Sequence, residues 1–209
     1  MPRRVATPLI GIAFANRHSI DLERDLSQNA YHSDTPALSP TGAMTIESWV
    51  NLESISAGQG IVHKWSTSCC TRSYGFQVSQ VGGISYLVAG ISSDGGASPG
   101  SYKTIEVPYV FVPGQWYHVA FVCSPRTKME LFVDGLSVGV VTAGVPSGIN
   151  DNEAEFQVGA FIDETGPSSF FDGKIDEVRL WGVARTQAEI ANNMNLELAG
   201  TEAGLLGYW

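Results

Sequence analysis

The chain has few features that would place it in a membrane, on a nucleic acid or among disordered proteins. It contains no run of about 18 apolar residues, the length that a helix needs to cross a bilayer. Lys and Arg number 12 against 21 Asp and Glu, a net charge of −9 that repels phosphate backbones and anionic lipids. A hydrophobic share of 44% excludes disorder. We expect a folded protein with no membrane insertion and no nucleic-acid partner.

Cysteine is scarce and odd in number. Cys69 and Cys70 lie among Ser, Thr and Arg, which is typical of an exposed loop, whereas Cys123 lies in an apolar strand pattern. Adjacent cysteines rarely pair, because the bond strains the peptide between them. No His or Cys stands nearby at zinc-ligand spacing. At least one thiol is therefore unpaired within the chain, and a bridge from the loop to Cys123 stays open.

Helical periodicity is almost absent before residue 185. Short β-type runs alternate instead with Gly, Pro, Ser, Asn and Asp, the pattern of a sandwich or barrel. We expect strands near residues 9–14, 18–23, 44–52, 60–65, 73–80, 83–91, 102–107, 115–124, 128–134, 137–142, 154–160, 170–181 and 204–209. All-β sandwiches often run to about 200–250 residues as one unit. The 209 residues therefore predict a single domain.

The first residues allow two interpretations. A basic start followed by an apolar stretch up to Ala15 resembles a short signal peptide. Pro8 interrupts that stretch, however, and residues 9–14 fit a first strand, which we favour. Residues 1–8 are then a tail or a signal remnant.

Two local motifs predict a hairpin and a helix. Asp134-Gly135 joins two β-rich runs, and this pair tolerates the positive φ angles of a type I′ turn. Before the turn, Met129, Leu131 and Val133 should face the core, with Glu130, Phe132 and Asp134 on a wet face. Residues 186–189 (Thr-Gln-Ala-Glu) fit a capping box. Ile190 and Met194 would give the helix a buried stripe against an edge or end of the sandwich.

Three segments, in order, resemble the laminin-G-like branch of the concanavalin-A-like lectin and glucanase superfamily, which includes pentraxins. They are residues 38–51, residues 114–122 with the following Asp-Gly hairpin, and residues 171–190 with the closing 204–209. The resemblance implies an all-β fold of two antiparallel sheets in a jelly-roll sandwich, with one short C-terminal helix. It departs at residues 14–16 (Phe-Ala-Asn), where relatives often carry Phe-Asp-Gly.

A catalytic site is not evident. Glucanases of this superfamily carry a Glu-x-Asp-x-Glu strand, whose alternation points all three carboxylates into one cleft. The chain has no such run; its nearest candidates are Glu47 and the Asp176-Glu177 pair, whose side chains should point to opposite faces. We therefore predict a protein that is not an enzyme, with glycoside hydrolysis or lysis by carboxylates from separate strands as the alternative.

The resemblance implies a possible Ca²⁺ site. Pentraxins bind Ca²⁺ through a Glu, Gln and Asp run in a loop that here reads Ala-Phe-Ile-Asp163-Glu164, where only Asp163 matches in position. Ca²⁺ takes about 6–8 oxygens. Backbone carbonyls, residues 150–153 or the Asp94 loop would have to complete the shell.

Asp176 is the third candidate ligand. It lies in an apolar strand with Val178 and Leu180 on its own face, so its carboxylate should point inward. An unpaired buried charge costs too much to persist. The favoured alternative is that Asp176 accepts hydrogen bonds from backbone or Arg.

Aromatic rings near loops suggest sugar platforms, because a flat ring packs against the apolar face of a pyranose. Our candidate ligand-binding residues are Trp65, Tyr74, Tyr102 and Phe161. Aromatics in a sandwich are, however, more often core residues. Trp49, Trp116 and Trp181 lie inside strong strand patterns and are assigned to the core, and His118 is interpreted as a structural strand residue.

These features favour a non-catalytic recognition module, extracellular or at the cell surface, that binds a glycan or an extracellular protein, with Ca²⁺ as a candidate cofactor. A structural module that assembles through its sheet edges or faces is a further alternative.

Overall fold

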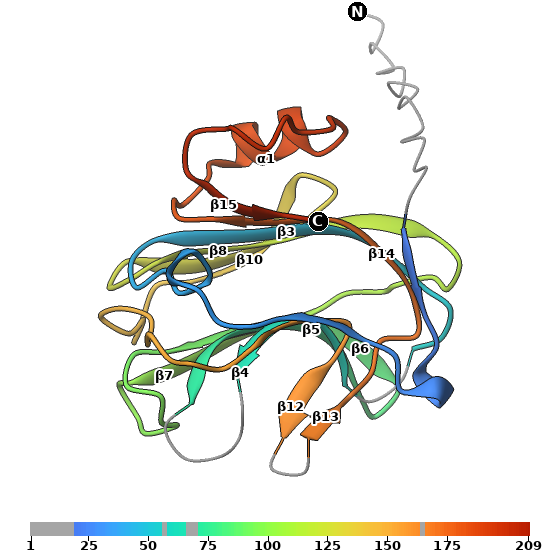
Figure 1. Cartoon of the computed structure of the whole chain (residues 1–209), viewed down its shortest axis with the longest axis horizontal. Coiled ribbons are helices and arrows are strands. Elements are labelled where there is room, and N and C mark those ends of the chain that lie inside the picture. Colours follow the sequence, from blue (N-terminus) through green and yellow to red (C-terminus); the bar gives the residue numbers. More distant parts are fainter. Residues whose placement is uncertain (1–18, 56–57, 66–70, 164–165) are drawn as a thin grey trace, which may run out of the picture.

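The computed structural model describes residues 19–55, 58–65, 71–163 and 166–209. It confirms the predicted all-β sandwich of two antiparallel sheets with one short C-terminal helix (Figure 1). One sheet has the strand order β1-β14-β3-β8-β9-β10, and β15 also pairs with β14. Its strands are β1 (Ile20–Leu22), β3 (Met44–Leu52), β8 (Trp116–Ser124), β9 (Lys128–Val133), β10 (Leu136–Val141), β14 (Gly173–Trp181) and β15 (Leu205–Tyr208).

The second sheet has six strands in the order β2-β11-β4-β5-β6-β7. They are β2 (Ala30–His32), β4 (Gln59–Trp65), β5 (Arg72–Val81), β6 (Ile84–Ser92), β7 (Tyr102–Pro108) and β11 (Phe156–Val158). A separate hairpin of β12 (Phe161–Asp163) and β13 (Gly166–Ser168) projects from the outer side of this sheet (Figure 1). The helices are α1 (Gln187–Asn193) and two short 3₁₀ turns, η1 (Arg24–Leu26) and η2 (Pro36–Leu38).

The core lies between the sheets and follows from strand alternation. On β5, Tyr74, Phe76 and Val78 are fully buried and face the opposite sheet, where the Phe76 and Phe121 ring centroids lie 6.3 Å apart. Each large apolar side chain buried in this way stabilises the fold by about 1.5–3 kcal/mol. Cys123 belongs to this core as a free thiol, and burial raises its pKa to about 12. Cys69 and Cys70 lie outside the described residues.

The predicted hairpin and helix are both present. Asp134 and Gly135 have φ angles of 49° and 74°, as a type I′ turn requires. Helix α1 begins after Thr186, whose hydroxyl accepts from the Glu189 backbone N–H while Glu189 accepts from the Thr186 N–H. The side chains on these elements differ in part from expectation. Phe132, predicted to face water, is buried.

Helix α1 explains this difference, because it covers the outer face of the seven-stranded sheet and not an edge or end (Figure 1). Ile190 packs there against Ala120, Val122 and Phe132. Met194 caps the helix, and its carbonyl accepts from the Trp49 indole N–H at 2.8 Å. One outer face of the sandwich is thus closed by the chain itself.

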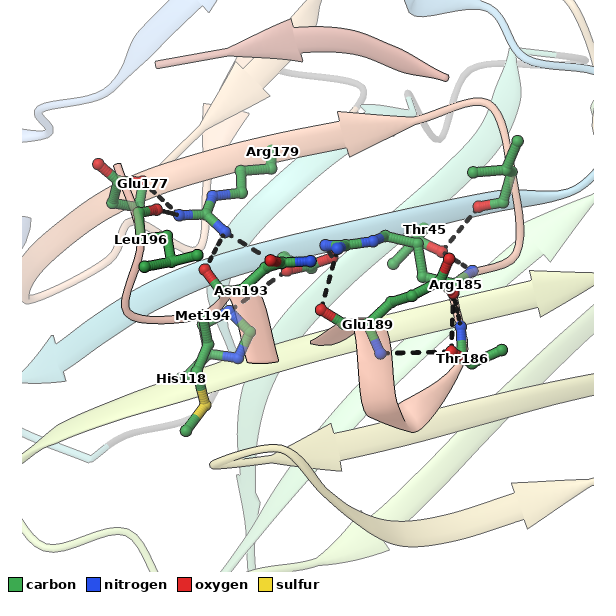
Figure 2. Close-up of polar contacts among 12 residues, drawn as sticks. Thr45, His118, Glu177, Arg179, Arg185, Thr186, Glu189, Asn193, Met194 and Leu196 are labelled. Atoms are coloured by element: carbon green, nitrogen blue, oxygen red, sulfur yellow. Dashed lines mark hydrogen bonds and ion pairs between the residues drawn. The ribbon is translucent and has the colours of Figure 1, made fainter. Parts of the chain in front are cut away.

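Buried charges hold this cover in place (Figure 2). Glu47 of β3 is fully buried and pairs with Arg185, while Arg179 lies 3.9 Å and His118 3.5 Å from its other oxygen. Arg179 also donates to the carbonyls of Asn193 and Leu196 beyond the sheet. The strand residue His118 is therefore structural, as predicted. Within the described residues, no helix is long and apolar enough to span a membrane.

Candidate functional site

The outer face of the six-stranded sheet carries a groove. It consists of two adjacent cavities with volumes of about 280 and 300 Å³, which share Gln77 and Val88 as lining residues. The residues that line the first cavity come mainly from β4, β5, β6 and β7 and from the β12–β13 hairpin. Its principal residues are His63, Trp65, Gly75, Gly90, Tyr102, Thr104 and Phe161.

Two glycines form the floor of the first cavity. Gly75 of β5 pairs with Gly90 of β6, so the sheet has no side chain at two neighbouring positions. A Cβ on Gly75 would lie 2.6 Å from Nδ1 of His63, and one on Gly90 would lie 3.5 Å from the Trp65 ring. The His63 ring can lie this low over the sheet only because position 75 is glycine, and a Cβ on Gly90 would be in ordinary van der Waals contact with the Trp65 ring.

Aromatic rings form the walls. The Trp65 ring centroid lies 5.4 Å from that of Tyr102 and 6.4 Å from that of Phe161, with both pairs tilted or edge-on. Phe161 also meets His63 edge-on at 5.0 Å. Arg72 lies beyond the wall, with its guanidinium carbon 5.8 Å from the Trp65 centroid. These rings come from three different strands and enclose one apolar recess.

Two residues that line this recess carry buried polar atoms without partners among the described residues. His63 is 3% exposed, and neither of its ring nitrogens has a hydrogen-bond partner among the described residues. Trp65 is 8% exposed, and its indole N–H is likewise unpartnered there. Burial lowers the pKa of His63 to about 3, so its imidazole is neutral at physiological pH. Because buried polar groups normally have partners, these three atoms are suited to a ligand or ordered water.

The second cavity is more polar. It continues along the strands from Gln77 and Val88 toward Ser79 and Tyr86, and Glu106 of β7 lines it with an exposed carboxylate. Glu106 is the sole charged residue among the described residues that line the two cavities. The groove thus changes from aromatic at one end to hydroxyl, amide and carboxylate at the other.

The structure brings together three of the four predicted ligand-binding aromatics. Trp65, Tyr102 and Phe161 line the same cavity. The prediction for Tyr74 is wrong, because β5 alternates so that Tyr74 faces the core, where its ring is fully buried and its hydroxyl donates to the Leu38 carbonyl at 2.7 Å. Sequence analysis missed His63 and the glycine floor. Isolated glycines inside two paired strand patterns were the available signal, since they mark places where another group approaches the backbone closely.

Asp176, one of the three predicted calcium ligands, lies on β14 of the seven-stranded sheet, whereas Asp163 lies on β12. The backbone of Asp163 ends β12, and Glu164 lies outside the described residues. The two loops that we expected to supply further Ca²⁺ ligands, residues 150–153 and the Asp94 loop, make other contacts. Asp94 accepts from the Gly96 N–H at 2.8 Å, and Asn152 accepts from Lys64 Nζ at 3.1 Å. No group of three His, Cys, Asp or Glu side chains that could hold a metal occurs in the described part of the chain.

The prediction that Asp176 points inward with Val178 and Leu180 is wrong. The pairing of β14 with β3 slips between Asp176 and Arg179, and Glu177 takes a left-handed φ of 51°. This bulge puts Val178 in the core but places Asp176 opposite Trp49. The alternation that predicted an inward carboxylate is therefore interrupted by one irregular step.

Glycoside hydrolysis normally uses a pair of carboxyl groups about 5–10 Å apart across the scissile bond. Among the described residues lining the groove, Glu106 is the sole carboxylate. Glu47, the other early candidate, is buried beneath α1 on the opposite sheet and pairs with Arg185. The described geometry of the groove fits binding better than hydrolysis.

Solved structures with the same fold include several proteins connected with carbohydrate. A candidate carbohydrate-binding protein from Bacteroides ovatus ATCC 8483 is 22% identical with a TM-score of 0.70, over 91% of this chain and 50% of that one. The CBM40 of the Ruminococcus gnavus IT-sialidase, bound to α2,3-sialyllactose, is 11% identical with a TM-score of 0.62. The match covers 84% of this chain and 96% of that one. A pentraxin from Limulus polyphemus is 18% identical with a TM-score of 0.52, and the match covers 72% of this chain and 70% of that one.

The chain thus spans half the length of the Bacteroides protein. No curated protein sequence matches it. A family model, Laminin_G_3, described as the concanavalin A-like lectin/glucanases superfamily, matches residues 25–191. This match covers most of the chain and agrees with the two-sheet sandwich. The chain therefore belongs to the Laminin_G_3 family of the concanavalin A-like lectins and glucanases.

Proposed function

We propose that the protein is a non-catalytic carbohydrate-binding module that holds a glycan in the groove on its six-stranded sheet. The observation that carries this proposal is the first cavity, where aromatic walls enclose unpartnered buried polar atoms above a glycine floor. Ligand pockets combine apolar walls with a few fixed polar groups in this way. The likeness to carbohydrate-binding modules supports the proposal.

The geometry suggests how a sugar would bind. The half-buried rings of Tyr102 and Phe161 would contact the apolar face of a pyranose, and His63 and Trp65 would bond its hydroxyls from below. Gln77 and the second cavity would receive the neighbouring sugar unit. The first cavity, at about 280 Å³, is at the small end of known ligand pockets and suits a single ring. We place the binding event outside the cell, where polysaccharides and glycoproteins are exposed.

Truncation of the cavity wall tests the proposal. We expect Tyr102→Ala and Phe161→Ala each to weaken binding by about tenfold, because each removes ring contact worth about 1.5 kcal/mol. The measurement is affinity gel electrophoresis against a panel of soluble polysaccharides. Leu136→Ala, which truncates a 64% exposed side chain on the other sheet, is the control and should migrate like the wild type. Equal retardation of wild type and both wall variants would place binding elsewhere.

Calcium assistance is a separate proposal that rests on Asp163 and Glu164. Asp163 ends the strand that begins with Phe161, so an ion held there would order the wall of the first cavity. We expect millimolar Ca²⁺ to raise the melting temperature and EDTA to lower it, because a ligand that binds only the folded state stabilises that state. Asp163→Asn should abolish the Ca²⁺ response. Identical melting in Ca²⁺ and EDTA would remove this proposal and leave the groove unaffected.

A further inference from the structure

The charge of the groove limits which glycans it can accept. Glu106 contributes the sole charge among its described lining residues, and the whole chain carries −9. Arg72, the cation beside the groove, is held over the Trp65 ring and lines neither cavity. An acidic sugar would therefore meet a carboxylate without a compensating cation from the described lining. An uncharged sugar would meet no such repulsion.

The unpartnered atoms in the first cavity point to the same class of ligand. A neutral imidazole offers one donor and one acceptor, and the Trp65 indole offers one donor. A hydroxyl both donates and accepts, so neighbouring hydroxyls can satisfy all three atoms. An ionised carboxylate only accepts, so a carboxylate placed against the acceptor nitrogen of His63 would leave that nitrogen unpaired. Because His63 is 3% exposed, that missing bond would not be replaced by bulk water.

His63 also cannot become the missing cation. Its ring is enclosed by Phe161 and by the backbone of Gly75, and burial keeps the pKa of His63 near 3. A carboxylate in the cavity would find a neutral ring over most of the accessible pH range. The site is thus built for hydroxyl groups and not for charge pairing.

We infer that the groove selects uncharged, hydroxyl-rich glycans over acidic ones, with His63 and Trp65 bonding hydroxyls in the first cavity and Glu106 repelling carboxylates in the second. This inference rests on the proposed function. It assigns Glu106 as a specificity-determining residue.

Matched polysaccharides that differ mainly in a carboxyl group test the inference. We would compare methyl-esterified polygalacturonate with polygalacturonate, and mannan with polymannuronate, by affinity electrophoresis at low salt. The wild type should bind the neutral member at least about fivefold more tightly, the factor that a single repulsion near 4 Å gives in water. Glu106→Gln should narrow this ratio of affinities by strengthening the binding of the acidic member. Glu197→Gln, an equal charge change at an exposed site outside the groove lining, should leave the ratio unchanged.

A second variant separates hydrogen bonding from charge. His63→Phe keeps an aromatic ring but removes both nitrogens, and it should weaken neutral binding by about three- to tenfold if each lost bond has its usual strength. Its melting curve checks that the variant is folded. Equal or tighter binding of the acidic members would overturn the inference and leave the proposed function intact. Retardation by no polysaccharide would overturn the proposed function, and the inference with it.

Discussion

Glu47→Gln is expected to lower the free energy of unfolding by about 3–5 kcal/mol at pH 7. The substitution keeps the shape of the side chain but removes the buried negative charge that Arg185 and Arg179 share. The Arg185 guanidinium would then stay buried without its carboxylate partner, whereas Arg179 would keep its ion pair with Glu177. A buried charge without a partner costs far more than the ion pair itself contributes. Urea unfolding followed by tryptophan fluorescence measures the difference.

The network also predicts the direction of its pH dependence. Burial alone would raise the pKa of Glu47, but its contacts with His118 and Arg185 lower that pKa below the ordinary value. A carboxyl group with a lowered folded-state pKa contributes stability above its unfolded pKa and loses it as pH falls. Acid should therefore weaken the attachment of α1, which Arg185 and Arg179 hold to the sheet.

A surface pair provides the control for Glu47. Glu53 lies 3.9 Å from Lys174, and both side chains are more than one-third exposed. Glu53→Gln should change the unfolding free energy by less than about 1 kcal/mol, because solvent screens such pairs. A Glu47→Gln effect as small as that of Glu53→Gln would contradict the role assigned to the buried network.

The second large effect concerns His63 and acid. Burial lowers the pKa of His63 to about 3 in the folded protein, against an ordinary value of 6.5. Below pH 6.5, His63 is therefore protonated in the unfolded chain but stays neutral in the folded protein. The free energy of unfolding falls until the pH reaches about 3. At 1.36 kcal/mol per pH unit, the loss attributable to His63 is about 3 kcal/mol at pH 4.5.

His63→Asn isolates this contribution, because asparagine does not titrate. The unfolding free energies of wild type and variant are compared at pH 7 and again at pH 4.5. The buried carboxylates lose stability in both proteins, so their share cancels in the difference between the two pH values. We expect wild type to lose about 3 kcal/mol more than the variant on acidification. Parallel losses would show that His63 is accessible to protons in the folded state.

The fold could be predicted because its signals are local. The β-type pattern of residues 44–52 predicts strand β3. Adjacent residues likewise predict the turn at Asp134-Gly135 and the start of the helix at the Thr186–Glu189 capping box. Strand β2 and the β12–β13 hairpin, whose strands are each three residues long, were not expected. Such short strands form because the rest of the sandwich positions them.

The misassigned side chains depend on distant or irregular geometry. The bulge at Glu177 changes the face of Asp176, and no residue in the strand pattern signals it. Phe132 is buried because α1, more than 50 residues later in the chain, covers it. Arg185, the ion-pair partner of Glu47, lies farther still along the sequence. Burial by a later segment cannot be read from a strand's own alternation.

The candidate groove could be predicted only in part. Trp65, Tyr102 and Phe161 were chosen as aromatics beside loops, and the sheet brings them into one cavity. The positions of these three aromatics in the sequence do not show that Gly75 and Gly90 pair beneath them. That pairing depends on the register of β5 and β6. For the same reason the strand pattern does not mark His63, although His63 lines the cavity beside Phe161.

The central claim is that the outer face of the six-stranded sheet binds glycan, and a crystal structure with a bound oligosaccharide tests it most directly. The probe is a fragment of whichever polysaccharide retards the wild type most. The account predicts a sugar ring above Gly75 and Gly90, in contact with Tyr102 and Phe161 and within hydrogen-bond distance of His63. A sugar bound on the loops or on the α1 face, with this groove unoccupied, would contradict it.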